Sequence, residues 1–187
     1  SEPAWRTQGA PVASPNPARP MTPSRRPSPL VPFLIAAACS GCAALLNQVM
    51  WSRVLSLVFG STIEAVSGVT AIFMAGLALG SALAPRLVVN RSAGEAALLY
   101  SRVELLIGGA AIFLAFVLPA LEPVRASVGA GPLWFLAILL LLVPAGLMGT
   151  TLVIQSHVVS SSVDHALGSR TAGLLFTANT FGAVVGA

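Results

Sequence analysis

The sequence predicts an all-helical, polytopic transmembrane bundle, and three observations lead to that class. The 187 residues are 56% hydrophobic and only 9% charged, whereas a water-soluble domain carries about 25% charged residues. Uncharged stretches cover residues 27–52, 65–84, 105–121 and 126–163, and a bilayer core requires roughly 20 apolar residues in helical form. No segment shows the alternating pattern of barrel strands, so we expect helices to satisfy the backbone polar groups in lipid.

Five spans follow from these stretches, and the last is predicted to be truncated. They cover residues 31–50, 62–84, 96–118, 133–154 and 171–187. Together they make residues 30–187 one transmembrane domain, incomplete at its C-terminus. Residues 1–29 are rich in Pro, Ser and Arg, which predicts a disordered cytoplasmic tail. Arg25 and Arg26 also fit the start of a secretory signal, but the following run is long, so we expect a retained first helix.

Local signals predict where the spans end. Trp51 and Arg53 indicate the membrane interface after the first span, since aromatic residues and charges are enriched there. Pro85 predicts the end of the second span, and Pro144 predicts a kink in the fourth. The second and third spans open with the capping-box spacing: Ser61 with Glu64, and Ser92 with Glu95.

The distribution of arginine predicts the orientation. All ten basic residues are arginine, and eight lie in the N-terminal tail or in the regions after the second and fourth spans. Arg53 and Arg125 belong to the opposite side. Because positive loops stay in the cytoplasm, we expect a cytoplasmic N-terminus and a place in the bacterial inner membrane. The arginines do not cluster with aromatic residues, so no nucleic-acid partner is expected.

Small residues recur four positions apart on three of the spans. These sets are Ala36, Ser40 and Ala44; Gly76, Gly80 and Ala84; and Ala178, Gly182 and Gly186. Such faces let helix backbones approach closely in lipid. Static packing is the expected role, and a sliding surface in a transporter is the functional alternative.

Three polar side chains fall within the spans. Glu104 is a candidate for proton or cation handling, but it also fits an acid that snorkels to the cytoplasmic interface. Arg102 does not face it, because residues two apart on a helix point in different directions. Gln48 and Asn179 need hydrogen-bond partners inside the membrane, and interhelical bonds are expected before ligand binding.

The remaining reactive residues match no known site. Cys39 and Cys42 form a C-x-x-C without the context of a redox or haem site. His157, Asp164 and His165 have no zinc-site spacing and fit a solvated loop. The chain also has no phosphate-binding glycine loop. We therefore expect no catalytic residue, metal site or cofactor in this chain.

Three segments carry a family resemblance: Ser40–Ser61, Phe73–Ser81 and Leu175–Ala187. They resemble the membrane half of bacterial spermidine-synthase-like proteins, in which the helices are major-facilitator-like. The resemblance implies a cytoplasmic Rossmann-like aminopropyltransferase domain downstream, which binds decarboxylated S-adenosylmethionine and a polyamine. None of its catalytic residues is present here. Pro85 departs from the major-facilitator pattern, where an Asp commonly precedes the Arg.

The expected function is therefore a multi-pass anchor for a spermidine-synthase-like protein, which also handles its substrate. One alternative is half of a cation or polyamine transporter, with Glu104, Gln48 and Asn179 along a polar path. Another is a non-catalytic packing subunit of a larger membrane complex. The expected partners are the lipid bilayer, downstream helices, a C-terminal synthase domain, and further subunits bound through the Gly and Ala faces.

Overall fold

The computed structural model describes residues 30–161 and 165–187 and shows a bundle of six helices there, with no strand. The helices are α1 Leu30–Phe59, α2 Thr62–Val88, α3 Ala93–Val117, α4 Leu121–Val128, α5 Ala130–Ser160 and α6 His165–Gly186. Four of them, α1, α2, α3 and α5, are long and apolar enough to cross a membrane. The all-helical prediction is confirmed for the described residues, and four of the five predicted spans correspond to helices of spanning length and apolar composition.

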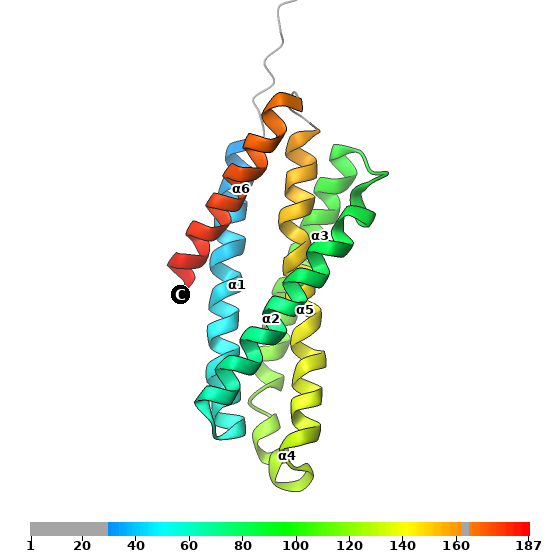
Figure 1. Ribbon diagram of the computed structural model, residues 1–187. Helices are drawn as coiled ribbons and strands as arrows, with labels where there is room; N and C mark the ends of the chain where they lie inside the picture. Colours follow the sequence, from blue (N-terminus) through cyan, green and yellow to red (C-terminus); the bar gives the residue numbers. More distant parts are fainter. Residues whose placement is uncertain (1–29, 162–164) are drawn as a thin grey trace, which may run out of the picture.

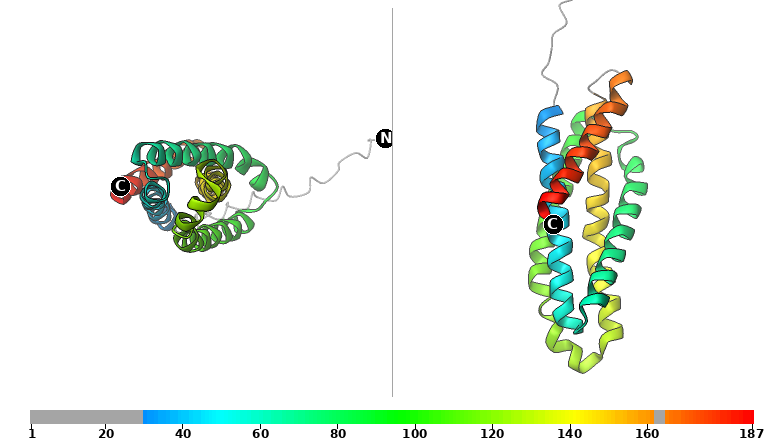
Figure 2. Two further views of the ribbon diagram at one scale, coloured as in Figure 1. Left: turned by 90° about the horizontal axis from the view of Figure 1, so that it is seen from below. Right: turned by 60° about the vertical axis from the view of Figure 1, so that its left-hand side comes forward.

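The helices run alternately between two ends of an elongated bundle (Figure 1). The start of α1, the α2–α3 turn, the end of α5 and the start of α6 lie at one end, and α4 lies at the other. Helix α5 contacts all five other helices, and half of the residues in its most apolar stretch are buried. Helix α6 lies along α1 in every view (Figure 2). Helix α5 is therefore the centre of the bundle, and α1 and α6 form a pair beside it.

The arginines occupy both ends of this bundle. Arg86, Arg91 and Arg170 lie at the end where α1 begins, because α2 and α5 finish there. Arg53 and Arg125 lie toward the opposite end, near the α1–α2 turn and on α4. Arg102, which the prediction assigns to the loop after the second span, lies within α3, and Arg6, Arg19, Arg25 and Arg26 of the predicted disordered tail lie outside the described residues. A cytoplasmic N-terminus stays a prediction.

Helix α1 is longer than its predicted span. It continues from Met50 to Phe59, and Trp51 is buried rather than interfacial. The Trp51 ring packs edge-on against Phe73 of α2, with centroids 6.4 Å apart. At the end of α1, Phe59 stacks on Trp134 of α5 at 4.0 Å. Contacts with α2 and α5 therefore stabilise α1 beyond Trp51 and Arg53, the residues that predicted the end of the first span.

Helix α2 also passes its predicted end. Pro85 lies within the helix, which continues to Val88, and the Val89 N–H donates to the Pro85 carbonyl. A proline removes one backbone donor and is costly in a helix interior. Here it stands in the last turns, where few hydrogen bonds follow it. Ala84 and Val88, both buried, hold this end of α2 in the bundle.

The short helix α4 lies between α3 and α5, in a segment that the sequence leaves between spans. Leu121 is buried at its start, and Gly129 ends it with a φ of 80°. The Arg125 Nη1 donates to the Val58 carbonyl at 3.0 Å, near the last turn of α1. A cationic side chain at a helix C-terminus donates hydrogen bonds to free carbonyl groups and interacts favourably with the negative end of the helix dipole. Arg125 therefore connects α4 to α1.

The predicted capping box at the start of α3 is present. The Ser92 N–H donates to Glu95 Oε2 at 2.8 Å, and the Glu95 N–H donates to Ser92 Oγ at 3.3 Å. At the start of α2 one of the two hydrogen bonds of a capping box forms. The Glu64 N–H donates to Ser61 Oγ at 3.4 Å, and the Glu64 residue is exposed. These caps set the first residue of each helix.

Glycines bring α2 and α5 into backbone contact. A Cβ at Gly80 would overlap the Gly146 carbonyl, and one at Gly149 would overlap Leu77. At Gly76 it would lie 3.0 Å from the Gly146 nitrogen. Such closeness gives dispersion contacts that lipid cannot replace. The small residues predicted on α2 therefore lie at the contact with α5.

A second backbone contact joins α1 and α6. A Cβ at Gly182 would overlap the Ala38 carbonyl, and one at Gly186 would overlap the Cys42 carbonyl. Ala178 packs against a small core formed by Ala37, Val159 and Leu175. The face of α1 that meets α6 is thus the one with Ala38, Gly41 and Cys42. Of the small residues predicted to pack on α1, Ser40 and Ala44 line a cavity together with Gly41, and Ala44 also packs against the main core.

A methyl group at Gly80 tests the α2–α5 contact. A Cβ there would lie 2.8 Å from the Gly146 carbonyl carbon and 3.1 Å from Gly149 Cα. We expect Gly80→Ala to lower the free energy of unfolding in detergent by about 1–3 kcal/mol. The matched control is Gly108→Ala on α3, where a Cβ meets no atom within 4 Å, so that helix propensity raises stability by up to ~1 kcal/mol. Equal stability of the two variants would contradict the contact.

Candidate functional site

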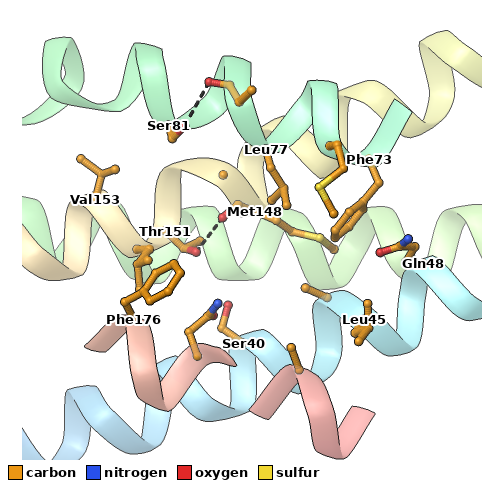
Figure 3. Close-up of a pocket in the computed structure, with 18 residues that line it drawn as sticks. Ser40, Leu45, Gln48, Phe73, Leu77, Ser81, Met148, Thr151, Val153 and Phe176 are labelled. Atoms are coloured by element: carbon orange, nitrogen blue, oxygen red, sulfur yellow. Dashed lines mark hydrogen bonds between the residues drawn. The ribbon is translucent and has the colours of Figure 1, made fainter. Parts of the chain in front are cut away.

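A cavity of about 410 Å³ lies between α1, α2, α5 and α6 (Figure 3). Its wall is mainly apolar, and the large side chains in it include Phe73, Leu77, Met148 and Phe176. Cavities of this size, apolar with a few polar groups, are typical of small-molecule sites. The cavity is therefore the first candidate for a binding site.

Two hydroxyl groups in the wall are already used as donors. Ser81 Oγ donates to the Ala78 carbonyl at 3.0 Å, and Thr151 Oγ1 donates to the Met148 carbonyl at 2.8 Å (Figure 3). Bonds of this kind to the preceding turn are the usual way in which a hydroxyl is accommodated in an apolar helix. These two groups can therefore only accept hydrogen bonds from a molecule in the cavity.

Gln48 offers the cavity a free acceptor. Its Nε2 donates to Thr70 Oγ1 on α2 at 3.1 Å, which is an interhelical bond of the kind expected for this residue. Its Oε1 is buried and has no partner among the described residues. Figure 3 shows this oxygen on the side of the amide that faces the middle of the cavity. A buried carbonyl oxygen without a donor is costly, and a ligand N–H or O–H group would satisfy it.

Asn179 reaches the same cavity from α6. Its side chain lies against α1 at Gly41, where a Cβ would be 3.0 Å from Asn179 Oδ1 and would overlap the Asn179 carbonyl. Asn179 lines the cavity, and its side chain makes no hydrogen bond within the described part of the chain. The structure therefore brings Gln48 and Asn179 together, although they are far apart in the sequence.

Glu104 lies elsewhere. It is half-buried on α3 and is not among the residues that line the cavity. Tyr100, one turn earlier on α3, has its hydroxyl near the side chains of both Glu104 and Gln155 of α5. The three polar residues predicted from the sequence are thus divided between two places in the bundle.

Sequence reasoning missed Gln155. This side chain is only 1% exposed, and neither its Nε2 nor its Oε1 has a hydrogen-bond partner among the described residues. One carboxylate oxygen of Glu104, Oε1, is also buried without a partner. The signal was present, since Gln155 is the one amide within the uncharged stretch of residues 126–163. What the sequence lacks is any sign that α3 places an acid beside it.

The other reactive residues remain apart. Cys39 is exposed and Cys42 half-buried, and both are free thiols. The His157 Nε2 lies 3.1 Å from the Arg91 carbonyl and so joins the end of α5 to the α2–α3 turn. Asp164 and the side chain of His165 lie outside the described residues. Within the described part of the chain, no three His, Cys, Asp or Glu side chains gather to hold a metal ion.

Comparison with known proteins assigns no family. No protein family, curated protein or solved structure matches the chain. The resemblance to spermidine-synthase-like proteins therefore rests on the three sequence segments alone.

Removing the hydroxyl of Thr70 tests the Gln48 contact. We expect Thr70→Val to lower the free energy of unfolding in detergent by about 0.5–2 kcal/mol, because it leaves a second polar atom of Gln48 without a partner. Gln48→Leu combined with Thr70→Val should recover most of that loss, since both polar groups are then absent. A double-mutant cycle by thermal unfolding measures the coupling, and a coupling of zero would show that the bond does not form.

Proposed function

We propose that this chain is the membrane-embedded part of a spermidine-synthase-like protein, and that it anchors a cytoplasmic synthase domain at the bacterial inner membrane. The observation that supports this most directly is the position of the three resembling segments. Ser40–Ser61, Phe73–Ser81 and Leu175–Ala187 supply every residue of the cavity wall that does not come from α5. Segments that are far apart in the sequence but share a family resemblance thus meet at one cavity.

The anchoring role is supported by the length and packing of the helices. Four helices have spanning length and apolar composition, and two close backbone contacts hold the bundle together at glycines. In this proposal α6 is the fifth span. It is less apolar than the others because Thr177, Asn179 and Thr180 interrupt it. The major-facilitator-like architecture belongs to the same proposal.

The cavity wall indicates what kind of molecule it would bind. It contains no carboxylate, and its free polar groups are the Gln48 oxygen, the Asn179 amide and the Ser40 hydroxyl. A highly charged polyamine would find no counter-charge there, and burying uncompensated charge is expensive. The cavity therefore fits an uncharged, mainly apolar molecule with one or two hydrogen-bonding groups. Substrate handling by this domain is proposed for a molecule of that kind.

A transporter half for a cation or polyamine is the second proposal. Gln48 and Asn179 share one cavity, as a transport site between helices would require, but the wall of that cavity holds no carboxylate to balance a cation. Glu104 does not line this cavity, so a path through all three residues requires a different arrangement of α3. Cation flux through reconstituted protein that is unchanged by Glu104→Gln would count against this function.

A non-catalytic packing subunit is the third proposal. The glycines of α2 and α6 contact other helices of the same chain. An oligomer, with copies of itself or with other proteins, would therefore use different surfaces. The exposed Gly108 and Gly109 on α3 offer such a surface. Purification as a monomer in mild detergent would argue against this role.

Deleting the membrane helices from the full-length protein tests the anchor. We expect aminopropyltransferase activity to move from the membrane pellet to the supernatant when residues 30–187 are removed, since four apolar helices hold it in lipid. The control is the full-length protein with Gly108→Ala, which should stay in the pellet. A protein that pellets equally without these residues would contradict the anchor. A downstream sequence without a glycine-rich nucleotide loop would end the link to the enzyme.

A further inference from the structure

A second polar cluster lies between α3 and α5, apart from the cavity. It consists of Tyr100, Glu104 and Gln155, and the two helices run side by side (Figure 1). The Tyr100 hydroxyl lies beside both the Glu104 carboxylate and the Gln155 amide. Neither amide atom of Gln155 has a partner with hydrogen-bond geometry, and Glu104 Oε1 has none either. The Tyr100 hydroxyl thus lies near two side chains that keep three buried polar atoms without a hydrogen-bond partner among the described residues.

Buried apolar residues flank the cluster along both helices. Val103 and Ile107 of α3 are buried, as are Ile154 and Val158 of α5. The ring of Tyr100 packs against Phe33 of α1, with centroids 6.1 Å apart. Glu104 lies eleven residues after the first residue of α3, which places it about 16 Å along the helix. The carboxylate is therefore inside the spanning part of α3 and away from its water-facing first turn.

An ionised carboxylate at this depth requires a counter-charge. Ionised groups in hydrocarbon are costly, and those found there are normally paired. Arg102 on the same helix is exposed and points in another direction, and within the described part of the chain no cation is paired with Glu104. The unpartnered Gln155 amide, which is almost completely buried, is a second and independent sign that something polar belongs between α3 and α5.

We propose that Glu104, Gln155 and Tyr100 form a binding site for one monovalent cation, held by carboxylate, carboxamide and phenol oxygens. A single carboxylate balances a single positive charge. Multiply charged metal ions are disfavoured, because no three His, Cys, Asp or Glu side chains gather in the described part of the chain. Both an alkali ion, which prefers oxygen ligands, and a primary ammonium group, with three donors for three oxygens, have the required chemistry. This site does not depend on the anchoring function.

Thermal unfolding of the purified protein in detergent tests the site. The starting buffer contains only a bulky cation, N-methylglucamine, and NaCl, KCl or methylammonium chloride is then added at constant ionic strength. We expect one of these three cations to raise the unfolding midpoint in a saturable way, by roughly 5 °C at about 100 times its Kd. The cation that acts at the lowest concentration distinguishes an alkali-ion site from an ammonium site. A midpoint that does not respond to any of the three would overturn the proposal.

Two variants connect the response to these residues. Glu104→Gln removes the charge and Gln155→Met removes the amide at similar volume, and each should abolish the cation-dependent rise or weaken the apparent affinity at least about tenfold. The matched control is Glu95→Gln, the same chemical change on the exposed first turn of α3, which should keep the full response. If Glu104→Gln does not fold, Gln155→Met alone decides the matter. A full response in Gln155→Met would show that the amide is no ligand and would overturn the site.

Discussion

The two close backbone contacts determine how the rest of this bundle is arranged. At one of them α2 and α5 approach through Gly76, Gly80 and Gly149, and at the other α1 and α6 approach through Gly182 and Gly186. In lipid the apolar side chains gain little by leaving their solvent, so dispersion between closely packed atoms must supply the attraction. Only positions without a side chain allow backbone atoms to come this near. The two contacts therefore fix the helices in pairs.

Pairing of this kind leaves a space where the pairs meet. The cavity has α1 and α6 on one side and α2 and α5 on the other, so it lies between two tight contacts rather than within one. The residues that hold the pairs are small, whereas the wall between them is formed by larger groups such as Phe73, Met148 and Phe176. Rigid pairs with a less tightly filled space between them suit a domain that binds a molecule within the membrane.

Polar groups inside the bundle fall into two classes, those with a hydrogen-bond partner and those without one. The hydroxyl groups of Ser81 and Thr151 bond to their own helices, and the Gln48 nitrogen bonds across to Thr70. Each of these groups therefore has an acceptor for the hydrogen that it donates. Gln48 Oε1, both amide atoms of Gln155 and Glu104 Oε1 are buried without a hydrogen-bond partner among the described residues, and such groups are costly inside a membrane. The contrast separates structural polar groups from those that we assign to binding.

The sequence by itself determined the helical class, the positions of the apolar helices, the capping box at Ser92 and the small-residue faces of α2 and α6. Each of these depends on composition or spacing within one segment. Only the tertiary structure decided which face of α1 meets α6, that Trp51 is buried, that α2 continues past Pro85, and that Gln155 and Glu104 both lie near the Tyr100 hydroxyl. A helix that is apolar on every side carries no periodic pattern to distinguish its lipid face from its protein face. The partners of each residue are therefore set by packing between distant segments, which no local pattern encodes.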